Sequence, residues 1–312
     1  MDQILKISRR KVLASAAAVS VGKGLVEGAA PEPIIDIHQH TNYSFRSDAQ
    51  LAAHQKKLGI TTTILLPSGR ALARASTHDG RSNGLAANVL PNESAQAMTE
   101  KYGCEFRFGA NEVPDIPETR KTLEKFLKAG AVLIGEQKFD VPCDSKYILQ
   151  LAEIAREFNV PVLMHFQHQA YNTGIERFHK VLEKFPDVNF IGHAQTWWGN
   201  IDANHCQRVM YPRGPVVPGG ISDRLLKDYP NMYGDLSAGS GRNSMLRDEE
   251  HAQWFLERHQ DKLMFGSDCP DSDGQSRGCI GFTTLAILRR LSVSKGIERK
   301  ILYGNAKRVF RL

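Results

Sequence analysis

Two histidines, His38 and His40, close a short apolar run near the amino end of the chain. In a β-strand, residues i and i+2 point to the same face and lie about 6.6 Å apart, so both imidazoles can reach one ion. The spacing predicts a metal-binding pair. Two histidines so spaced also occur as ordinary surface residues, so the pair needs support from other positions.

Four more side chains of metal-binding type follow apolar runs elsewhere in the chain: Glu136, His165, His193 and Asp268. Each stands at the carboxyl end of a predicted strand. Charged groups are costly to bury there unless they are paired or bind a metal. Nitrogen and carboxylate ligands together favour zinc, with manganese, iron and nickel as alternatives. The sequence therefore predicts a divalent metal centre.

The elements that must position these residues are short apolar or β-branched runs that alternate with longer segments of helical period, a pattern typical of parallel strands joined by crossover helices. The predicted strands are 34–40, 60–66, 104–109, 131–136, 160–165, 188–193, 232–236 and 263–268. Eight such units predict an α/β fold, a (β/α)8 TIM barrel, in which the carboxyl ends of the strands meet at one mouth. An open doubly wound sheet is the alternative.

The intervening segments predict helices near 48–58, 93–102, 116–128, 146–158, 174–185 and 297–310. Residues 68–83 are predicted to form a polar loop, and residues 196–220, rich in Gly and Pro, an insertion between the sixth and seventh strands. No linker separates a second domain. Residues 31–312 are therefore predicted to form one barrel domain.

Five segments, in this order, resemble the amidohydrolase superfamily, specifically its amidohydrolase-2 branch: Asp36–His40 (DIHQH), Val162–His165 (VLMH), Phe190–His193 (FIGH), Phe265–Asp268 (FGSD) and Leu302–Ala306 (LYGNA). The resemblance covers nearly all of the chain after residue 30. It implies a metal-dependent TIM-barrel enzyme in which His38, His40, His165 and Asp268 bind metal.

The resemblance also implies roles for His193 and Glu136. A histidine at the end of strand six binds a second metal or contacts substrate in this family. Some members use a carboxylated lysine or a glutamate at the end of strand four to bridge two metals, and Glu136 matches the glutamate version; Lys138, on the same strand face, is the alternative.

The predicted catalytic residues are Asp268 and His193. A bound metal lowers the pKa of water toward about 7 and polarises the group under attack. Asp268 would take the proton from that water and return it to the leaving group, while His193 would bind the second metal or hold the developing oxyanion.

Residues predicted to contact the substrate follow the strand-end ligands within a few positions, where the specificity loops of barrels lie. They are His168, Tyr171, Trp197, Trp198 and Arg242. Packing at the barrel rim is the alternative for the two tryptophans. A solvent-facing position is the alternative for Arg242, which would otherwise grip a carboxylate.

The predicted function is that of a metal-dependent hydrolase, with metal-activated water acting on a small ester, lactone, amide or phosphoester. The alternative is a metal-dependent, non-oxidative decarboxylase, a carbon–carbon lyase acting on an aromatic or unsaturated carboxylic acid, because the same branch contains such enzymes. Glu136 favours the hydrolase, since decarboxylases of the branch usually work with one metal. A barrel that only binds is disfavoured because every expected ligand position is filled.

The composition is that of a soluble globular protein, with 41% hydrophobic and 24% charged residues. The net charge is +6, but five basic and only two acidic residues fall within the first 30 positions. No basic run with interleaved aromatic residues follows, which argues against nucleic acid as a partner. The predicted partner is a small-molecule substrate, and a homo-oligomer stays open.

The amino end carries Ser8–Leu13 (SRRKVL), an apolar stretch over 12–21 and small residues up to Ala30. Ser8–Leu13 resembles the twin-arginine signal of bacterial exported proteins. Residues 1–30 are therefore predicted to be a signal peptide that directs the protein through the twin-arginine export machinery to the periplasm or beyond. An ordinary secretory signal and an uncleaved anchor are the alternatives.

The chain has 5 cysteines and no C-x-x-C pair, so neither a disulfide framework nor a zinc-finger pattern is indicated. Cys269 and Cys279 fall in one predicted loop, where free thiols are expected and a disulfide is the alternative. Cys269, next to Asp268, is also placed to line the site.

Overall fold

The structure is a computed structural model that describes residues 32–73, 83–85, 88–274 and 278–312. The chain divides into two units, Met1–Glu32 and Pro33–Leu312. All of the described secondary structure lies in the second unit. The predicted signal peptide and part of the predicted loop 68–83 lie outside the described residues.

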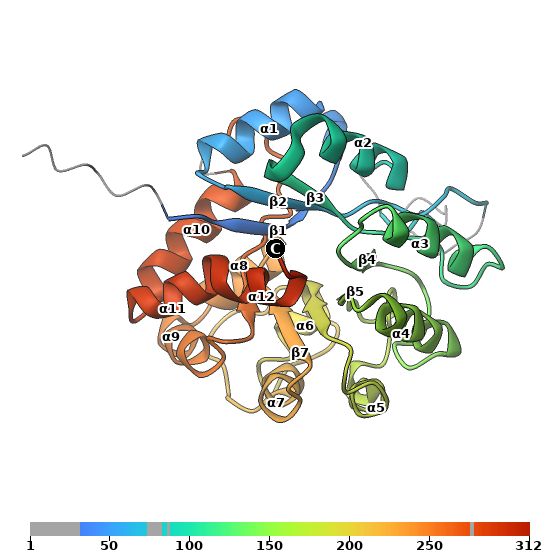
Figure 1. Ribbon diagram of the computed structural model, residues 1–312. Coiled ribbons are helices and arrows are strands. Elements are labelled where there is room, and N and C mark those ends of the chain that lie inside the picture. Colours follow the sequence, from blue (N-terminus) through green and yellow to red (C-terminus); the bar gives the residue numbers. More distant parts are fainter. Residues whose placement is uncertain (1–31, 74–82, 86–87, 275–277) are drawn as a thin grey trace, which may run out of the picture. The chain divides into compact units, whose positions relative to one another are not determined.

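Eight short parallel strands form the centre of the second unit (Figure 1). They are β1 Ile35–Gln39, β2 Thr62–Leu65, β3 Phe106–Phe108, β4 Ile134–Gln137, β5 Val162–His165, β6 Phe190–His193, β7 Met232–Asp235 and β8 Leu263–Met264. Each strand pairs with the next along the chain within two runs, β1-β2-β3 and β4-β5-β6-β7-β8. This sequential parallel order is that of a barrel rather than of a doubly wound sheet.

Backbone hydrogen bonds join the two runs at both seams. Between β3 and β4, the Ala110 N–H donates to the Leu133 carbonyl at 2.8 Å, and the Gly135 N–H donates to the Ala110 carbonyl at 2.9 Å. Between β8 and β1, the Ile37 N–H donates to the carbonyl of Phe265 at 3.1 Å. The sheet is closed, and the predicted (β/α)8 barrel is confirmed.

Helices surround the strands (Figure 1). They are α1 Asp48–Lys57, α2 Asn92–Tyr102, α3 Thr119–Lys128, α4 Lys146–Phe158, α5 His179–Lys184, α6 Ala194–Gly199, α7 Ile221–Asp228, α8 Ala238–Leu246, α9 Glu249–Arg258, α10 Ile280–Leu291, α11 Lys295–Arg299 and α12 Asn305–Phe310. The described residues also form three short 3-10 helices, Tyr43–Phe45, Gly103–Glu105 and Ile175–Arg177, and a π-helix, Lys300–Gly304.

Two layers of apolar side chains hold the barrel together. Inside it, strand residues such as Ile37, Leu163 and Ile191 pack with Val309 and Phe310 of α12. Figure 1 shows α12 lying across the barrel. A larger cluster fills the space between the outer faces of the strands and the helices. Because α12 fills the end where the strands begin, the opposite end forms the mouth.

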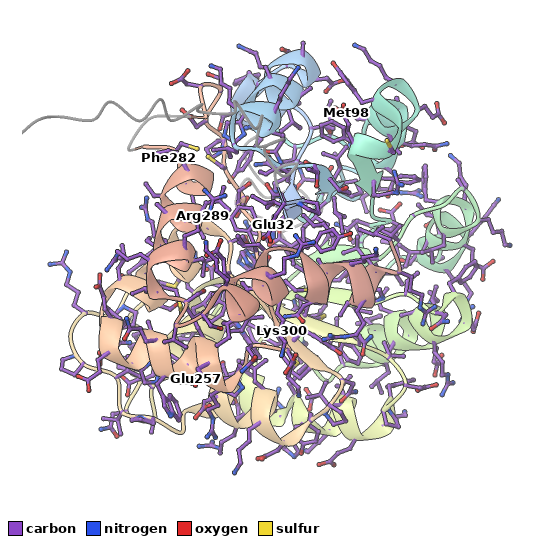
Figure 2. The ribbon with its side chains drawn as sticks, turned by 60° about the vertical axis from the view of Figure 1, so that its left-hand side comes forward. Glu32, Met98, Glu257, Phe282, Arg289 and Lys300 are labelled. Atoms are coloured by element: carbon purple, nitrogen blue, oxygen red, sulfur yellow. The ribbon has the colours of Figure 1, made fainter. Side chains whose placement is uncertain are left out.

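The described helices include none that is both long enough and apolar enough to span a membrane. Charged side chains of the outer helices, such as Glu257 on α9 and Arg289 on α10, are exposed (Figure 2). The helices therefore have the apolar inner and polar outer faces expected of a barrel in water.

Several predicted elements differ in extent from the observed ones. The predicted helix 297–310 consists of α11, the π-helix and α12. The predicted strand 263–268 pairs only over Leu263–Met264, so Asp268 follows the strand instead of ending it. The predicted insertion 196–220 overlaps α6, which forms because both of its tryptophans bury against the sheet.

Gly192 on β6 leaves the space into which the Trp197 ring packs. An added Cβ at Gly192 would lie 2.3 Å from the nearest ring atom of Trp197, which is closer than real Cβ contacts. Trp197 is fully buried and also stacks on Phe166, with the ring centroids 6.0 Å apart. The close packing of α6 on the sheet thus depends on a residue without a side chain.

We predict that Gly192→Ala lowers the free energy of unfolding by about 1–3 kcal/mol, because overpacking forces the indole or the strand to move. Denaturant unfolding monitored by circular dichroism would measure the change. Gly296→Ala is the matched control: Gly296 lies in α11, its nearest Cβ contact would be an ordinary 3.7 Å, and alanine favours helix by up to about 1 kcal/mol. Equal stability of Gly192→Ala and wild type would contradict this packing.

Candidate metal centre

The barrel brings all six predicted ligand side chains to its mouth. His165 and His193 end β5 and β6 and are paired in register. His38 lies in β1, His40 directly follows it, and Glu136 lies in β4. Asp268 follows β8, and its backbone N–H donates to the His38 carbonyl at 2.8 Å. Residues 230 positions apart are thus neighbours because the strands close on one another.

Glu136 lies between two pairs of imidazoles. Its Oε2 atom is 3.4 Å from His38 Nε2 and 3.8 Å from His40 Nε2. Its Oε1 atom is 2.5 Å from His165 Nδ1 and 3.6 Å from His193 Nε2. Each carboxylate oxygen therefore faces a different histidine pair.

Asp268 faces the same centre from the opposite side of the H-x-H pair. Its Oδ1 atom is 3.3 Å from His40 Nε2 and 3.8 Å from His38 Nε2, and its Oδ2 atom is 3.9 Å from His193 Nε2. No described side chain or backbone group makes a geometrically sound hydrogen bond to the buried Oδ1 atom. The backbone of Asp268 is left-handed, with φ 44°, a conformation uncommon outside glycine and typical of functional sites.

Hydrogen bonds at the far ring nitrogens orient the imidazoles. His40 Nδ1 lies 2.7 Å from the Leu66 carbonyl oxygen, which can only accept, so the proton is on Nδ1 and the Nε2 lone pair faces the centre. His38 Nδ1 donates to Asp235 Oδ2 at 2.6 Å, so the Nε2 atom of His38 also faces the centre. The two Nε2 atoms are 3.2 Å apart. This is the arrangement of second partners that typically fixes metal-binding histidines.

Asp235 is a site residue that the sequence analysis missed. It ends β7, is fully buried, and accepts hydrogen bonds from His38 and from the Ser237 hydroxyl at 2.8 Å. Ser237 Oγ also lies 3.0 Å from His193 Nδ1. The available signal was the position of Asp235, at a strand end like the predicted ligands.

Tyr43 was also missed. Its ring packs edge-on against His40, with centroids 5.2 Å apart. The negative charge of Asp268 and burial together raise the pKa of Tyr43 above its ordinary value. No motif in the sequence marks this tyrosine, because its place depends on the turn that follows β1.

Asp36 ties the H-x-H strand to the segment that carries Asp268. One of its oxygens accepts from the backbone N–H groups of His38 and Ser267, at 3.0 and 2.9 Å. The other accepts from the side chains of Ser267 and Gln55, at 2.5 and 2.9 Å. Burial raises the pKa of Asp36 above its ordinary value in spite of these bonds.

The donor set and its electrostatics fit a divalent cation. Burial by itself lowers the pKa of His38, but Asp268, Asp235 and Glu136 outweigh that effect and hold the pKa well above its ordinary value. The same crowd of carboxylates attracts any cation at the centre. At the mouth, two sets of three side chains each place their possible ligand atoms within 4.8 Å of one another. One set is His38, His40 and Asp268, and the other is His38, Glu136 and His193.

His165 stands apart in its protonation. Burial lowers the pKa of His165 to about 4, and the positive charge of Lys138 acts in the same direction, although Glu136 opposes both. The imidazole is therefore neutral near pH 7. Glu136, and not Lys138, contacts the imidazoles; the Lys138 ammonium lies 5.5 Å from the ring centroid of Tyr171.

The structure separates the five predicted substrate contacts. Tyr171 packs edge-on against His165, with ring centroids 5.6 Å apart. His168 lines a neighbouring pocket of about 520 Å³, and its backbone N–H donates to the Thr196 hydroxyl. Arg242 lines a different pocket, of about 710 Å³, between α8 and α10, where Thr283 Oγ1 lies 3.5 Å from its guanidinium. Only Tyr171 of these three touches a predicted ligand.

Trp197 and Trp198 neither contact the candidate ligands nor lie at the barrel rim, and they pack in the core. Both are buried in the main apolar cluster behind β6 and β7. Their side chains lie between α6 and the outer face of the sheet, away from the barrel mouth. Trp198 still influences the centre, since its indole N–H donates to the Asp235 carbonyl at 2.9 Å.

Comparison with known proteins places this barrel in a family. The family model Amidohydro_2, described as amidohydrolase, matches residues 35–312. A search of curated proteins gave no significant match.

Three similar solved structures share the fold at low sequence identity. A probable 2-pyrone-4,6-dicarboxylic acid hydrolase from Acinetobacter baumannii has 12% identity and a TM-score of 0.59, covering 89% of this chain and 99% of that one. A 2,6-dihydroxybenzoate decarboxylase from Rhizobium has 13% identity and a TM-score of 0.57, covering 90% and 99%. A 5-carboxyvanillate decarboxylase from Novosphingobium aromaticivorans, complexed with manganese and a nitrobenzoic acid, has 14% identity and a TM-score of 0.54, covering 84% and 80%.

At these identities the solved structures support the fold, while the family match spans the whole barrel, including every residue of the centre. With its candidate metal ligands gathered at the mouth, the chain belongs to the amidohydrolase family, Amidohydro_2, and is an enzyme of the TIM-barrel amidohydrolase superfamily.

Proposed function

We propose that the protein is a metal-dependent hydrolase that acts on a small ester, lactone, amide or phosphoester. The observation that carries the proposal is the position of Glu136, whose two oxygens face different histidine pairs. A carboxylate placed in this way suits a bridge between two metal ions. Two ions held close together are typical of hydrolytic sites.

His38, His40 and Asp268 would hold one ion, and His165 and His193 the other, with Glu136 shared between them. Zinc is the proposed metal because imidazole and carboxylate ligands suit it, and manganese, iron or nickel would fit the same donors. When bound, the metal supplies Lewis-acid chemistry: it makes water a nucleophile near neutral pH and polarises the bond under attack.

Asp268 is the proposed proton carrier. Its buried Oδ1 atom has no hydrogen-bond donor among the described residues, so it has capacity to accept a proton from water. Tyr43, which packs against His40, would donate to Asp268 and keep the carboxylate in place while the proton moves to the leaving group. His193 would either hold the second ion or stabilise the developing oxyanion.

We also propose that the substrate carries a carboxylate, recognised near Lys138 and Tyr171. Lys138 is half-buried, and its ammonium lies 5.5 Å from the ring centroid of Tyr171, which itself packs against His165. The names of the similar solved structures describe a dicarboxylic acid, a dihydroxybenzoate and a carboxyvanillate as substrates. We propose His168 as a further substrate contact.

We also propose that residues 1–30 direct export by the twin-arginine route.

Decarboxylation of an aromatic or unsaturated acid is the second candidate. It is supported by the names of similar solved structures, which include 2,6-dihydroxybenzoate and 5-carboxyvanillate decarboxylases. This reaction releases carbon dioxide and needs no attacking water. The two candidates therefore differ in their products.

The deciding experiment incubates metal-loaded protein with two substrate panels, one of carboxylated lactones, esters and phosphoesters and one of hydroxybenzoates. We expect ring opening or ester cleavage, with ¹⁸O from labelled water in the product, and a loss of about 10²–10⁴-fold in kcat for Asp268→Asn. Release of carbon dioxide from a hydroxybenzoate, with no ¹⁸O in the organic or phosphate products of either panel, would replace the hydrolase by the decarboxylase.

We predict that Glu136→Ala lowers the metal content by about one equivalent per chain, because the bridging carboxylate is lost. Elemental analysis of the purified protein would measure this. Glu157→Ala is the control, since Glu157 is an exposed residue of α4 that pairs with Arg120. An unchanged metal content in Glu136→Ala would contradict the bridge and favour decarboxylation.

We predict that Asp235→Asn weakens metal binding by about 10–100-fold, because the amide oxygen keeps the bond to His38 but not the negative charge behind it. Competition with a chelator would give the affinity. The matched control is Asp223→Asn: Asp223 lies in α7 and makes a similar 2.6 Å bond to His259. Equal loss of affinity in both variants would show that folding, not charge, is responsible.

A further inference from the structure

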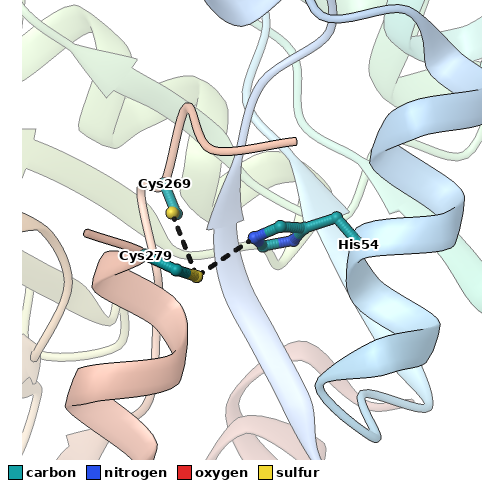
Figure 3. Close-up of side chains that lie close together, drawn as sticks. All are labelled: His54, Cys269 and Cys279. Carbon is teal, nitrogen blue, oxygen red and sulfur yellow. Dashed lines mark hydrogen bonds between the residues drawn. The ribbon is translucent and has the colours of Figure 1, made fainter. Parts of the chain in front are cut away.

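A second cluster of metal-binding side chains lies beside the barrel mouth and takes no part in the chemistry above. It consists of His54 from α1, Cys269 from the segment after β8 and Cys279 at the start of α10 (Figure 3). All three have an exposed fraction of 0%. Cys279 Sγ lies 3.5 Å from Cys269 Sγ and 3.3 Å from His54 Nε2.

The surroundings of His54 decide which of its nitrogens is free. The side-chain N–H groups of Gln55 donate to Asp36 Oδ2 at 2.9 Å and to Thr63 Oγ1 at 2.8 Å, which fixes the orientation of the amide. Gln55 Oε1 then accepts from His54 Nδ1 at 2.9 Å. In neutral His54 the proton is therefore on Nδ1, and the Nε2 lone pair points at Cys279 Sγ.

One of the two sulfurs lies at the amino end of a helix. Cys279 is the N-cap of the 12-residue helix α10, and its sulfur accepts from the Phe282 N–H at 3.3 Å. The Cys269 sulfur lies 3.5 Å from this capping sulfur. Such a donor, together with the positive end of a helix dipole, stabilises negative sulfur.

We propose that His54, Cys269 and Cys279 bind one zinc ion, separate from the metal centre at the barrel mouth. Zinc–sulfur and zinc–nitrogen bonds of about 2.3 and 2.0 Å in a tetrahedral site place the sulfurs about 3.8 Å apart and sulfur and nitrogen about 3.5 Å apart. The observed separations of Cys279 Sγ from Cys269 Sγ and from His54 Nε2 are within a few tenths of an ångström of these, and all three ligand atoms lie within 4.8 Å of one another. A fourth ligand, water or another small molecule, completes the site, since no fourth His, Cys, Asp or Glu of the described residues joins the group.

The charges balance in this complex. On binding, each thiol loses its proton to solvent, and the two thiolates neutralise the double positive charge of zinc, while the imidazole stays neutral. Two buried thiolates without a cation would be costly, and monovalent copper would leave one negative charge uncompensated. Divalent zinc is therefore the ion that the cluster fits.

The ion would have a structural role at the seam where the barrel closes. His54 belongs to the first βα unit, whereas Cys269 and Cys279 belong to the last, and β1 and β8 meet at this seam. Cys269 directly follows Asp268. A metal bond here would therefore restrain the segment that carries the proposed proton carrier.

Cobalt tests the proposal because sulfur-bound cobalt(II) has a near-ultraviolet charge-transfer band that cobalt bound by nitrogen and oxygen alone lacks. The full chain would be produced in zinc-poor medium with cobalt. We expect the band at one equivalent per chain, its loss in Cys279→Ser, and its retention in Glu136→Ala, which separates this site from the proposed catalytic centre. Cys143→Ser, a change at a buried cysteine that donates to the Gly174 carbonyl, should also retain it.

A measurement on the wild type covers the case in which Cys279→Ser does not fold. X-ray absorption at the zinc edge should show sulfur neighbours at about 2.3 Å. Absence of the cobalt band together with only nitrogen and oxygen neighbours of zinc would overturn the proposal. So would a Cys269–Cys279 disulfide, identified by peptide mapping under non-reducing conditions.

Discussion

Three carboxylates, Glu136, Asp235 and Asp268, are packed among imidazoles at the barrel mouth and are largely buried there. Burying ionised groups costs several kcal/mol each unless charges of opposite sign compensate them. Imidazoles are the groups here that can carry a compensating positive charge, and the carboxylates hold the pKa of His38 well above its ordinary value. The mouth of the barrel is thus built to hold positive charge, which a divalent ion would supply.

That requirement explains the density of hydrogen bonds behind the centre. Asn111 donates to the backbone carbonyls of Pro67 and Glu136, at 2.9 Å each, and so connects the ends of β2 and β4. Asn172 donates to the His165 carbonyl at 2.9 Å and also to that of Gln137. These side chains hold the strand ends in one arrangement, so the ligands do not have to be ordered when an ion binds.

The same region also closes the sheet, at the seam between β8 and β1. The seam between β8 and β1 carries His38 on one side and Asp268 on the other, and Asp36 bonds across it. The His54, Cys269 and Cys279 cluster lies behind this seam, on the helix side. The proposed catalytic centre and the proposed zinc site therefore lie on two sides of the seam between β8 and β1, and they use different ligands.

Much of the fold and of the candidate ligand set was predictable from sequence. His, Glu and Asp residues that follow apolar strands lie at the carboxyl ends of those strands, and in a barrel these ends meet at the mouth. The eight strands and the six ligand positions follow from that local pattern. The two tryptophans show its limit: closeness in sequence to His193 did not reveal that α6 turns back and buries them.

By itself, the sequence determined the alternation of strands and helices, the order of the candidate metal ligands and the family, because these depend on local pattern and spacing. Only the tertiary structure decided which groups meet. Asp235 contacts His38 across 197 positions, and Cys279 contacts His54 across 225. Such contacts depend on how the first and last units of the barrel close on each other, and neither partner carries a local signal of the other.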